Sequence, residues 1–208
     1  MPYSFRQFLE EITIEKAPGP STTFSVFHVL LAIEFIAEKP IGRNKLAKNL
    51  KVGEGAIRTI IDRLKDAELI MTSKAGCALT KKGLSLWKEY TSVLKKIEIG
   101  KSELTNASHN YAVLIRNQGH QLKSGMEQRD AAVMAGAKSA TTIVFKEGRL
   151  TIPSVSDNVA KDFPKAANQI NKLLKPEEKD VVIVVGADSS EKAKHSALAA
   201  AWTLLDSH

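Results

Sequence analysis

The feature that most constrains the fold is the segment from residue 40 to residue 83, where two short helical patterns flank a tight turn and a strand pair follows. The first helix is predicted over residues 43–50 and the second over residues 54–68. The second helix repeats apolar side chains at the spacing of one helical face: Ile57, Ile60, Ile61 and Leu64. Residues 69–80 predict two strands joined by a turn that contains Gly76. The apolar stripe therefore predicts which side of the second helix faces the core.

Positive charge is concentrated around this segment. The chain has 208 residues and a formal net charge of +7. Residues 39–96 hold 14 lysines and arginines against five acidic residues, whereas residues 101–208 hold 14 against 12. A polyanion is therefore the partner we expect for the N-terminal half. Scattered lysines on a solvated surface are the alternative, but the coincidence of charge and helical pattern favours the polyanion.

The residues expected to contact double-stranded DNA follow from turning the isoleucine stripe inward. The outward side of the second helix then carries Arg58 and Thr59, which can reach base edges or phosphates. Gly55 lets that helix approach DNA closely, and Lys74 at the strand turn can lie over the DNA backbone. The full expected set is Arg43, Lys45, Gly55, Arg58, Thr59, Lys74, Lys81 and Lys82. The alternative is an ordinary solvated helix face with balanced charges.

The run VGEGAIRTIIDRLKDAELI, followed by LTKKG, resembles winged-helix transcriptional regulators of bacteria and archaea. Together with its C-terminal half, the chain resembles an archaeal family of winged helix-turn-helix regulators that carry an uncharacterised α/β domain. The resemblance implies sequence-specific binding of duplex DNA, often by a dimer. The recognition-helix residues that it implies are Gly55, Arg58, Thr59 and Asp62, with Lys74 at the wing tip.

A connecting helix is predicted over residues 84–99. Its apolar stripe alternates at steps of three and four and consists of Trp87, Tyr90, Leu94 and Ile97. Such a short stripe can pair with the same helix of a second subunit or can pack on its own domain. A homodimer would suit the paired half-sites of DNA operators. We expect residues 1–100 and 101–208 to form two domains.

The C-terminal half alternates strand and helix patterns. Strands are predicted over residues 111–116, 141–146, 149–152 and 181–185, and helices over residues 126–135, 159–174 and 190–205. The βαββαβ order with one added helix predicts a ferredoxin-like domain. The expected fold class is therefore α+β, with an N-terminal winged helix-turn-helix domain and a C-terminal ferredoxin-like domain.

Two loops in the C-terminal half are candidate ligand sites. The first joins an apolar strand to a helix, where backbone N–H groups and hydroxyls can bind an anion or cap the helix. Its residues are Gly186, Asp188, Ser189 and Ser190. The second opens a helix with a small apolar face, where a charged pair can clamp a ligand or form a surface ion pair. Its residues are Gly125, Arg129 and Asp130.

The sequence gives little support for catalysis. It contains no HExxH, CxxC or GxSxG pattern, so we expect no catalytic residue, metal or cofactor. The single cysteine, Cys77, fits a reducing cytoplasm. No apolar run reaches about 18 residues, the length that spans a membrane, so no membrane partner is expected.

These observations predict a cytoplasmic transcriptional regulator that binds double-stranded DNA as a homodimer. The C-terminal domain is expected to respond to a small-molecule effector and so change operator affinity. The alternative is an enzyme that acts on a nucleotide or phosphorylated metabolite and carries a fused autoregulatory winged helix. A third interpretation is a protein-interaction adaptor.

Overall fold

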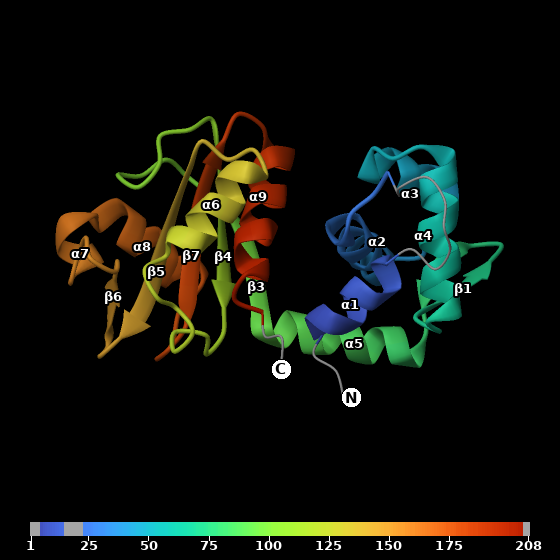
Figure 1. Cartoon of the computed structure of the whole chain (residues 1–208), viewed down its shortest axis with the longest axis horizontal. Helices are drawn as coiled ribbons and strands as arrows, with labels where there is room; N and C mark the ends of the chain where they lie inside the picture. Colours follow the sequence, from blue (N-terminus) through green and yellow to red (C-terminus); the bar gives the residue numbers. More distant parts are fainter. Residues whose placement is uncertain (1–4, 15–22, 206–208) are drawn as a thin grey trace. The chain divides into compact units, whose positions relative to one another are not determined.

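The computed structural model describes residues 5–14 and 23–205. The chain divides into two compact units, of which one runs to Thr91 and the other begins at Ser92. The N-terminal unit is mainly helical, and the C-terminal unit is built on a five-stranded antiparallel sheet (Figure 1). The expected α+β class is confirmed. Within the described ranges, no helix combines the length and the apolar character that crossing a membrane requires.

The N-terminal unit is organised around one central helix. Its elements are α1 (Phe5–Thr13), α2 (Val26–Glu38), α3 (Arg43–Leu50), α4 (Glu54–Asp66), β1 (Ile70–Ser73), β2 (Gly76–Leu79) and α5 (Lys81–Val93). α2 is apolar along most of its length because it contacts α1, α3 and β2. The isoleucine stripe of α4 faces the core as predicted, since Ile57, Ile60 and Leu64 are fully buried.

Two backbone features shape the chain from α3 to β2. Lys51 ends α3 in the left-handed conformation, with φ of 54°, and so turns the chain towards α4. Gly76 in the hairpin has φ of +115°, and a Cβ there would lie 2.5 Å from the carbonyl carbon of Ile41. Ile41 also forms a β-bridge with Cys77. The β1–β2 hairpin is therefore held against the chain that enters α3.

The C-terminal sheet places the last strand of the chain in its centre. Its strands are β3 (Leu94–Ile99), β4 (His109–Ile115), β5 (Ser139–Lys146), β6 (Arg149–Thr151) and β7 (Val181–Ala187). They lie in the order β3-β4-β7-β5-β6, and each neighbouring pair is antiparallel. Every residue of β7 is buried. A strand that is apolar on both faces needs cover on both, and the helices on the two faces of the sheet provide it.

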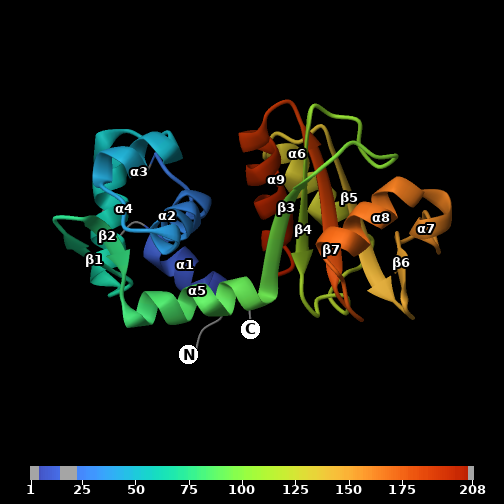
Figure 2. The ribbon, with the colours of Figure 1, turned by 180° about the vertical axis from the view of Figure 1, so that it is seen from behind.

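Helices cover both faces of this sheet. α6 (Met126–Met134) and α9 (Ser190–Trp202) contact each other and lie on one face (Figure 1). Figure 2 shows α8 (Pro164–Leu173) on the opposite face, next to the short α7 (Val159–Asp162). The core beneath α7 and α8 joins Val159 and Ile170 to strand residues such as Leu114 and Val182.

The predicted connecting helix over residues 84–99 is wrong in its second half. α5 ends at Val93, and Leu94–Ile99 instead form β3, which pairs with β4 along its whole length. Hydrogen bonds to a strand distant in sequence outweigh the local helical spacing. The remaining stripe residues pack within their own unit, because Tyr90 stacks on Phe5 with ring centroids 5.0 Å apart.

The predicted ferredoxin-like plan is also corrected. The expected strands and helices of the C-terminal half are present, but β3 is an additional edge strand and the helix over residues 159–174 is divided at Phe163, before Pro164. In the ferredoxin-like plan the third strand of the βαββαβ unit lies between the first two. Here the fourth, β7, lies between β4 and β5.

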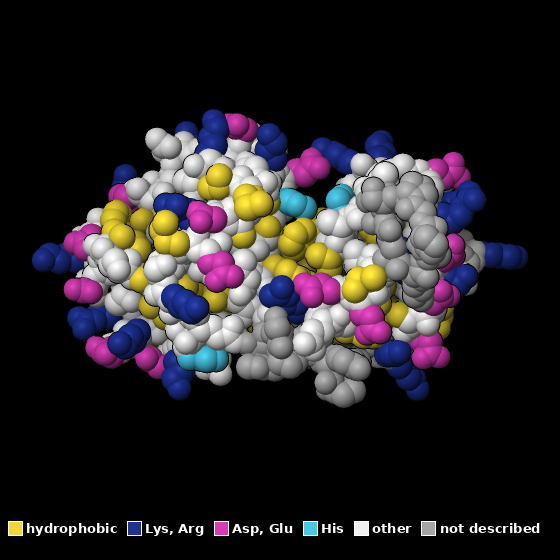
Figure 3. Space-filling model, in the orientation of Figure 1, with side chains coloured by type: hydrophobic (Ala, Val, Ile, Leu, Met, Phe, Trp, Pro, Cys, Tyr) yellow, Lys and Arg dark blue, Asp and Glu magenta, His cyan; other side chains and the backbone are white. Residues whose placement is uncertain are grey.

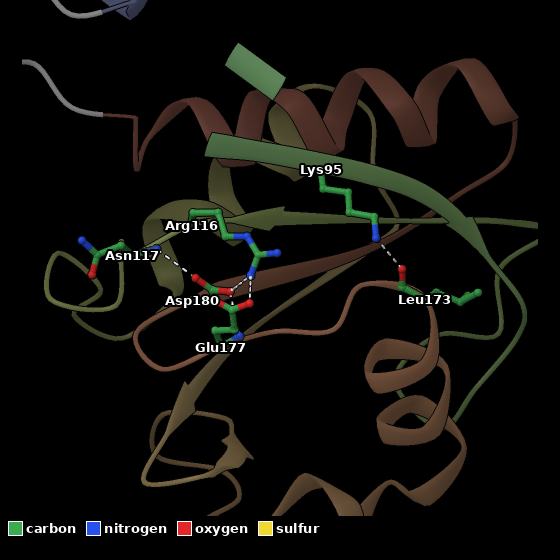
Figure 4. A network of polar contacts seen from close by, with 6 residues as sticks. All are labelled: Lys95, Arg116, Asn117, Leu173, Glu177 and Asp180. Atoms are coloured by element: carbon green, nitrogen blue, oxygen red, sulfur yellow. Dashed lines mark hydrogen bonds and ion pairs between the residues drawn. The ribbon is translucent and has the colours of Figure 1, made fainter. Parts of the chain in front are cut away.

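A buried carboxylate joins the end of β4 to the start of β7 (Figure 4). Asp180 is 2% exposed. It forms an ion pair of 2.5 Å with Arg116 and accepts backbone N–H bonds from Asn117 and Glu177. A buried charge is tolerated when it is paired and hydrogen-bonded in this way. Figure 4 also shows Lys95, on β3, donating to the Leu173 carbonyl oxygen of α8 at 2.8 Å.

Candidate nucleic-acid interface

The outward side of α4 is the centre of the candidate interface. With the isoleucines buried, the side chain of Arg58 is 61% exposed. Thr59 is half-buried, and its hydroxyl donates to the Gly55 carbonyl oxygen at 3.1 Å. A Cβ on Gly55 would meet no atom within 4 Å. Packing inside the unit therefore does not require glycine at that position, and the start of α4 presents open backbone.

One acidic residue, Glu54, joins two of the predicted DNA-contacting arginines. Its carboxylate lies 3.6 Å from Arg43 on α3 and 3.4 Å from Arg58 one turn further along α4. Glu54 occupies the first turn of α4, where a negative charge interacts well with the helix dipole. All three side chains are exposed, so these contacts are worth about 0–1 kcal/mol each and a phosphate can replace them.

A hollow of about 630 Å³ lies between the start of α3 and the β1–β2 hairpin. Three of the predicted residues line it, namely Arg43, Lys45 and Lys74. Thr72 and Ser73 add hydroxyl groups from the hairpin. The hollow therefore offers cations and hydroxyl donors from two separate elements, which is the chemistry that a phosphate backbone requires.

Cys77 also lines this hollow but does not supply a reactive group. Its side chain is buried, and burial raises the pKa of the thiol, with Lys65 opposing the shift in part. A thiol with a raised pKa stays protonated near neutral pH and is a poor nucleophile. Its place on β2 is explained by packing.

The remaining predicted cations lie at the other end of α4. Lys82 forms an ion pair of 3.6 Å with Glu68 and lies 5.8 Å from the ring centre of Phe8. Its neighbour Lys81 is exposed at the start of α5. The two ends of α4 are about 18 Å apart along the helix axis. The structure therefore divides the predicted set into one group around Glu54 and the hollow and another beside Glu68.

The loop after β7 makes contacts within the chain. Asp188 pairs with Lys138, and this hydrogen bond lowers the pKa of Asp188. The Ser189 hydroxyl accepts the backbone N–H of Lys192 at 3.2 Å and so caps α9, in which Ser190 is the first residue. The Ser189 contact is that of helix capping, the alternative role for this loop, whereas Asp188 forms an ion pair instead.

Gly186 lies inside β7 rather than in the loop that follows. It pairs with Asn110 and Ser139 on the neighbouring strands. A Cβ at Gly186 would lie 2.1 Å from the Thr105 hydroxyl oxygen. Close approach of a buried hydroxyl explains the glycine without a ligand.

The second candidate ligand loop leads into α6. Gly125 has φ of +79°, and a Cβ there would approach Thr142 to 3.0 Å. Arg129 and Asp130 form an exposed ion pair of 3.0 Å on α6. The structure therefore places this charged pair on an outward surface of the helix. No group of three or more potential metal-ligating side chains occurs in the part of the chain that the structure describes.

Sequence reasoning missed Glu54, which contacts two of the predicted arginines. The signal that could have found it is the i,i+4 spacing between Glu54 and Arg58 on a predicted helix. Its second contact, to Arg43, depends on how α3 packs against α4 and has no signature in the sequence.

Comparisons with known proteins match each unit separately. Residues 27–85 match the PH0730-like N-terminal domain, and residues 106–204 match a domain of unknown function, DUF4443. Among solved structures, the chain is similar to hypothetical protein PH0730 from Pyrococcus horikoshii OT3, with 27% sequence identity and a TM-score of 0.69. The match covers 87% of this chain and 92% of that one. No curated protein is significantly similar to the chain.

Proposed function

We propose that this protein is a DNA-binding transcriptional regulator whose N-terminal unit is a winged helix-turn-helix. α3 and α4 are the two helices of the motif, and the β1–β2 hairpin is the wing. The observation that supports this proposal most is the combination of a buried isoleucine stripe on α4 with exposed Arg58 on its outward side. In this class of motif, the second helix enters the major groove with its N-terminal residues against the bases.

The two groups of cations have different roles in this proposal. Arg58 and Thr59 lie on α4, where they can read base edges. The hollow lined by Arg43, Lys45 and Lys74 binds backbone phosphates and so fixes the position of the helix. Lys81 and Lys82 lie beside the far end of α4, so their contacts are to phosphates outside the base pairs that are read.

The C-terminal unit is proposed to respond to a small-molecule effector. α5 ends at Val93, and β3 begins at the next residue, Leu94. A ligand that shifts this edge of the sheet therefore also shifts the end of α5. A thermal-shift screen of metabolites on the full chain, with a turnover assay on each hit, tests this. Stabilisation without product supports a sensor, whereas product formation supports the enzymatic alternative.

The DNA-binding proposal is tested by measuring affinity for a duplex selected from a random library and for an unselected duplex. Arg58→Ala is expected to weaken binding to the selected duplex by about 5- to 150-fold and to reduce the preference between the two. Wild-type affinity should also fall steeply with rising salt, because phosphate contacts release counterions.

The matched control is Lys172→Ala, which removes one exposed positive charge from α8. It changes the net charge by the same amount without touching α4, so its affinity should equal that of the wild type. Equal affinities for Arg58→Ala and Lys172→Ala would contradict the assignment of α4 as the reading helix.

A further inference from the structure

α6 exposes large apolar side chains to solvent. Met126 is 47% exposed, Val133 is 49% exposed and Met134 is 89% exposed. The opposite side of the helix is covered, since Gln128 and Ala132 are buried. Figure 3 shows hydrophobic side chains at the surface over α6, with basic and acidic side chains beside them. An apolar face of this kind on a surface helix favours binding of another protein.

The charged pair lies in the middle of this face. Residues 129, 130 and 133 follow residue 126 by three, four and seven positions, so all four lie on one side of the helix. The side chains of Arg129 and Asp130 are 49% and 59% exposed, and the guanidinium of Arg129 donates to the carboxylate of Asp130 at 3.0 and 3.2 Å. The face therefore has apolar side chains at both ends and one positive and one negative charge at its centre.

We propose that a second copy of this chain docks on the outward face of α6. When two copies of α6 pack antiparallel across a two-fold axis, Arg129 of one copy lies opposite Asp130 of the other, and the reverse contact forms by symmetry. The methionines and Val133 then pack at the two ends of the contact. A face that carries both charges side by side is complementary to itself, which favours a second copy over a partner of one charge.

The contact is small. α6 has nine residues, and a stable specific interface commonly buries about 800 Å² on each partner. The dimer is therefore weak and depends on protein concentration. Methionine suits such a contact because its flexible side chain adapts to an imperfect fit. This inference uses only α6 and is independent of the proposed DNA binding.

The first test is sedimentation velocity of the full chain over a range of concentrations up to about 1 mM. The wild type should pass from monomer to dimer. Met134→Lys should weaken dimerisation by at least about tenfold, because it places a charge in the apolar contact. Met71→Lys is the matched control, since Met71 is 55% exposed on the hairpin, and it should dimerise as the wild type does.

The second test uses the charges. Arg129→Asp places acid opposite acid in its own dimer, and Asp130→Arg places base opposite base, so each variant alone should dimerise less than the wild type. A mixture of the two variants should associate more strongly than either alone, because each symmetric contact then joins opposite charges. A wild type that stays monomeric, or a mixture that associates no better than its components, would overturn the proposal.

Discussion

Two acidic residues of this chain, Asp180 and Glu54, each contact arginine side chains, and they do so in opposite surroundings. Asp180 is buried and also accepts two backbone N–H bonds, so its contacts are fixed by the fold. The side chain of Glu54 is 69% exposed and contacts the ends of two long side chains. The first ion pair holds two strands together, whereas the second can be exchanged for a ligand.

The largest effect is expected for the buried residue. Asp180→Asn removes the buried partner of Arg116, which keeps only its longer contact of 3.8 Å to the exposed Glu177, and it weakens the bonds to two backbone N–H groups. It should therefore destabilise the C-terminal unit by about 2–4 kcal/mol. Urea unfolding measures this change. Asp188→Asn, which removes an exposed ion pair with Lys138, should change the unfolding midpoint little. Similar urea midpoints for Asp180→Asn and Asp188→Asn would show that the buried ion pair contributes no more to stability than the exposed one.

A smaller and opposite effect is expected at the exposed site. Glu54→Gln releases Arg43 and Arg58 and removes a negative charge from the proposed interface. It should tighten binding to any duplex by about three- to tenfold and leave the unfolding midpoint nearly unchanged. Glu98→Gln is the control, because it removes one exposed negative charge from β3, away from the proposed interface. Binding equal to that of Glu98→Gln would place Glu54 outside the interface.

The smallest effect concerns pH. Burial lowers the pKa of His195 on α9, with Glu191 opposing the shift in part. The unfolded chain therefore binds the proton more readily, so this contribution to stability is complete above about pH 6.5 and is lost as the pH falls towards the folded pKa. Between pH 7.5 and pH 5.5, the free energy of unfolding of His195→Gln should fall by less than that of the wild type. An equal fall in both proteins would refute the role of His195.

Local patterns were predicted well because they depend on neighbours in the sequence. The isoleucines of α4 identified the buried side of that helix. β3 was not predicted because Leu94 and Ile97 also fit a helical stripe, and only pairing with β4 decides between them. Strand order likewise depends on long-range pairing.

The candidate site shows the same division. Arg58 was placed outward correctly, since its position follows from the stripe alone. The grouping of Arg43 with Lys74 around one hollow, and the separation of Lys82 from both, depend on packing between elements. The periodicity of the sequence carries no information about how far apart residues on different elements lie.

The order of the sheet has a consequence for aggregation. Its two outermost strands present unpaired backbone groups along one side, and such borders invite the addition of further strands. β3 carries Lys95, Lys96 and Glu98 along its border, and β6 has only three residues. The most apolar strand, β7, is enclosed between two neighbours. The sheet is therefore protected from growing into fibrils by the addition of strands.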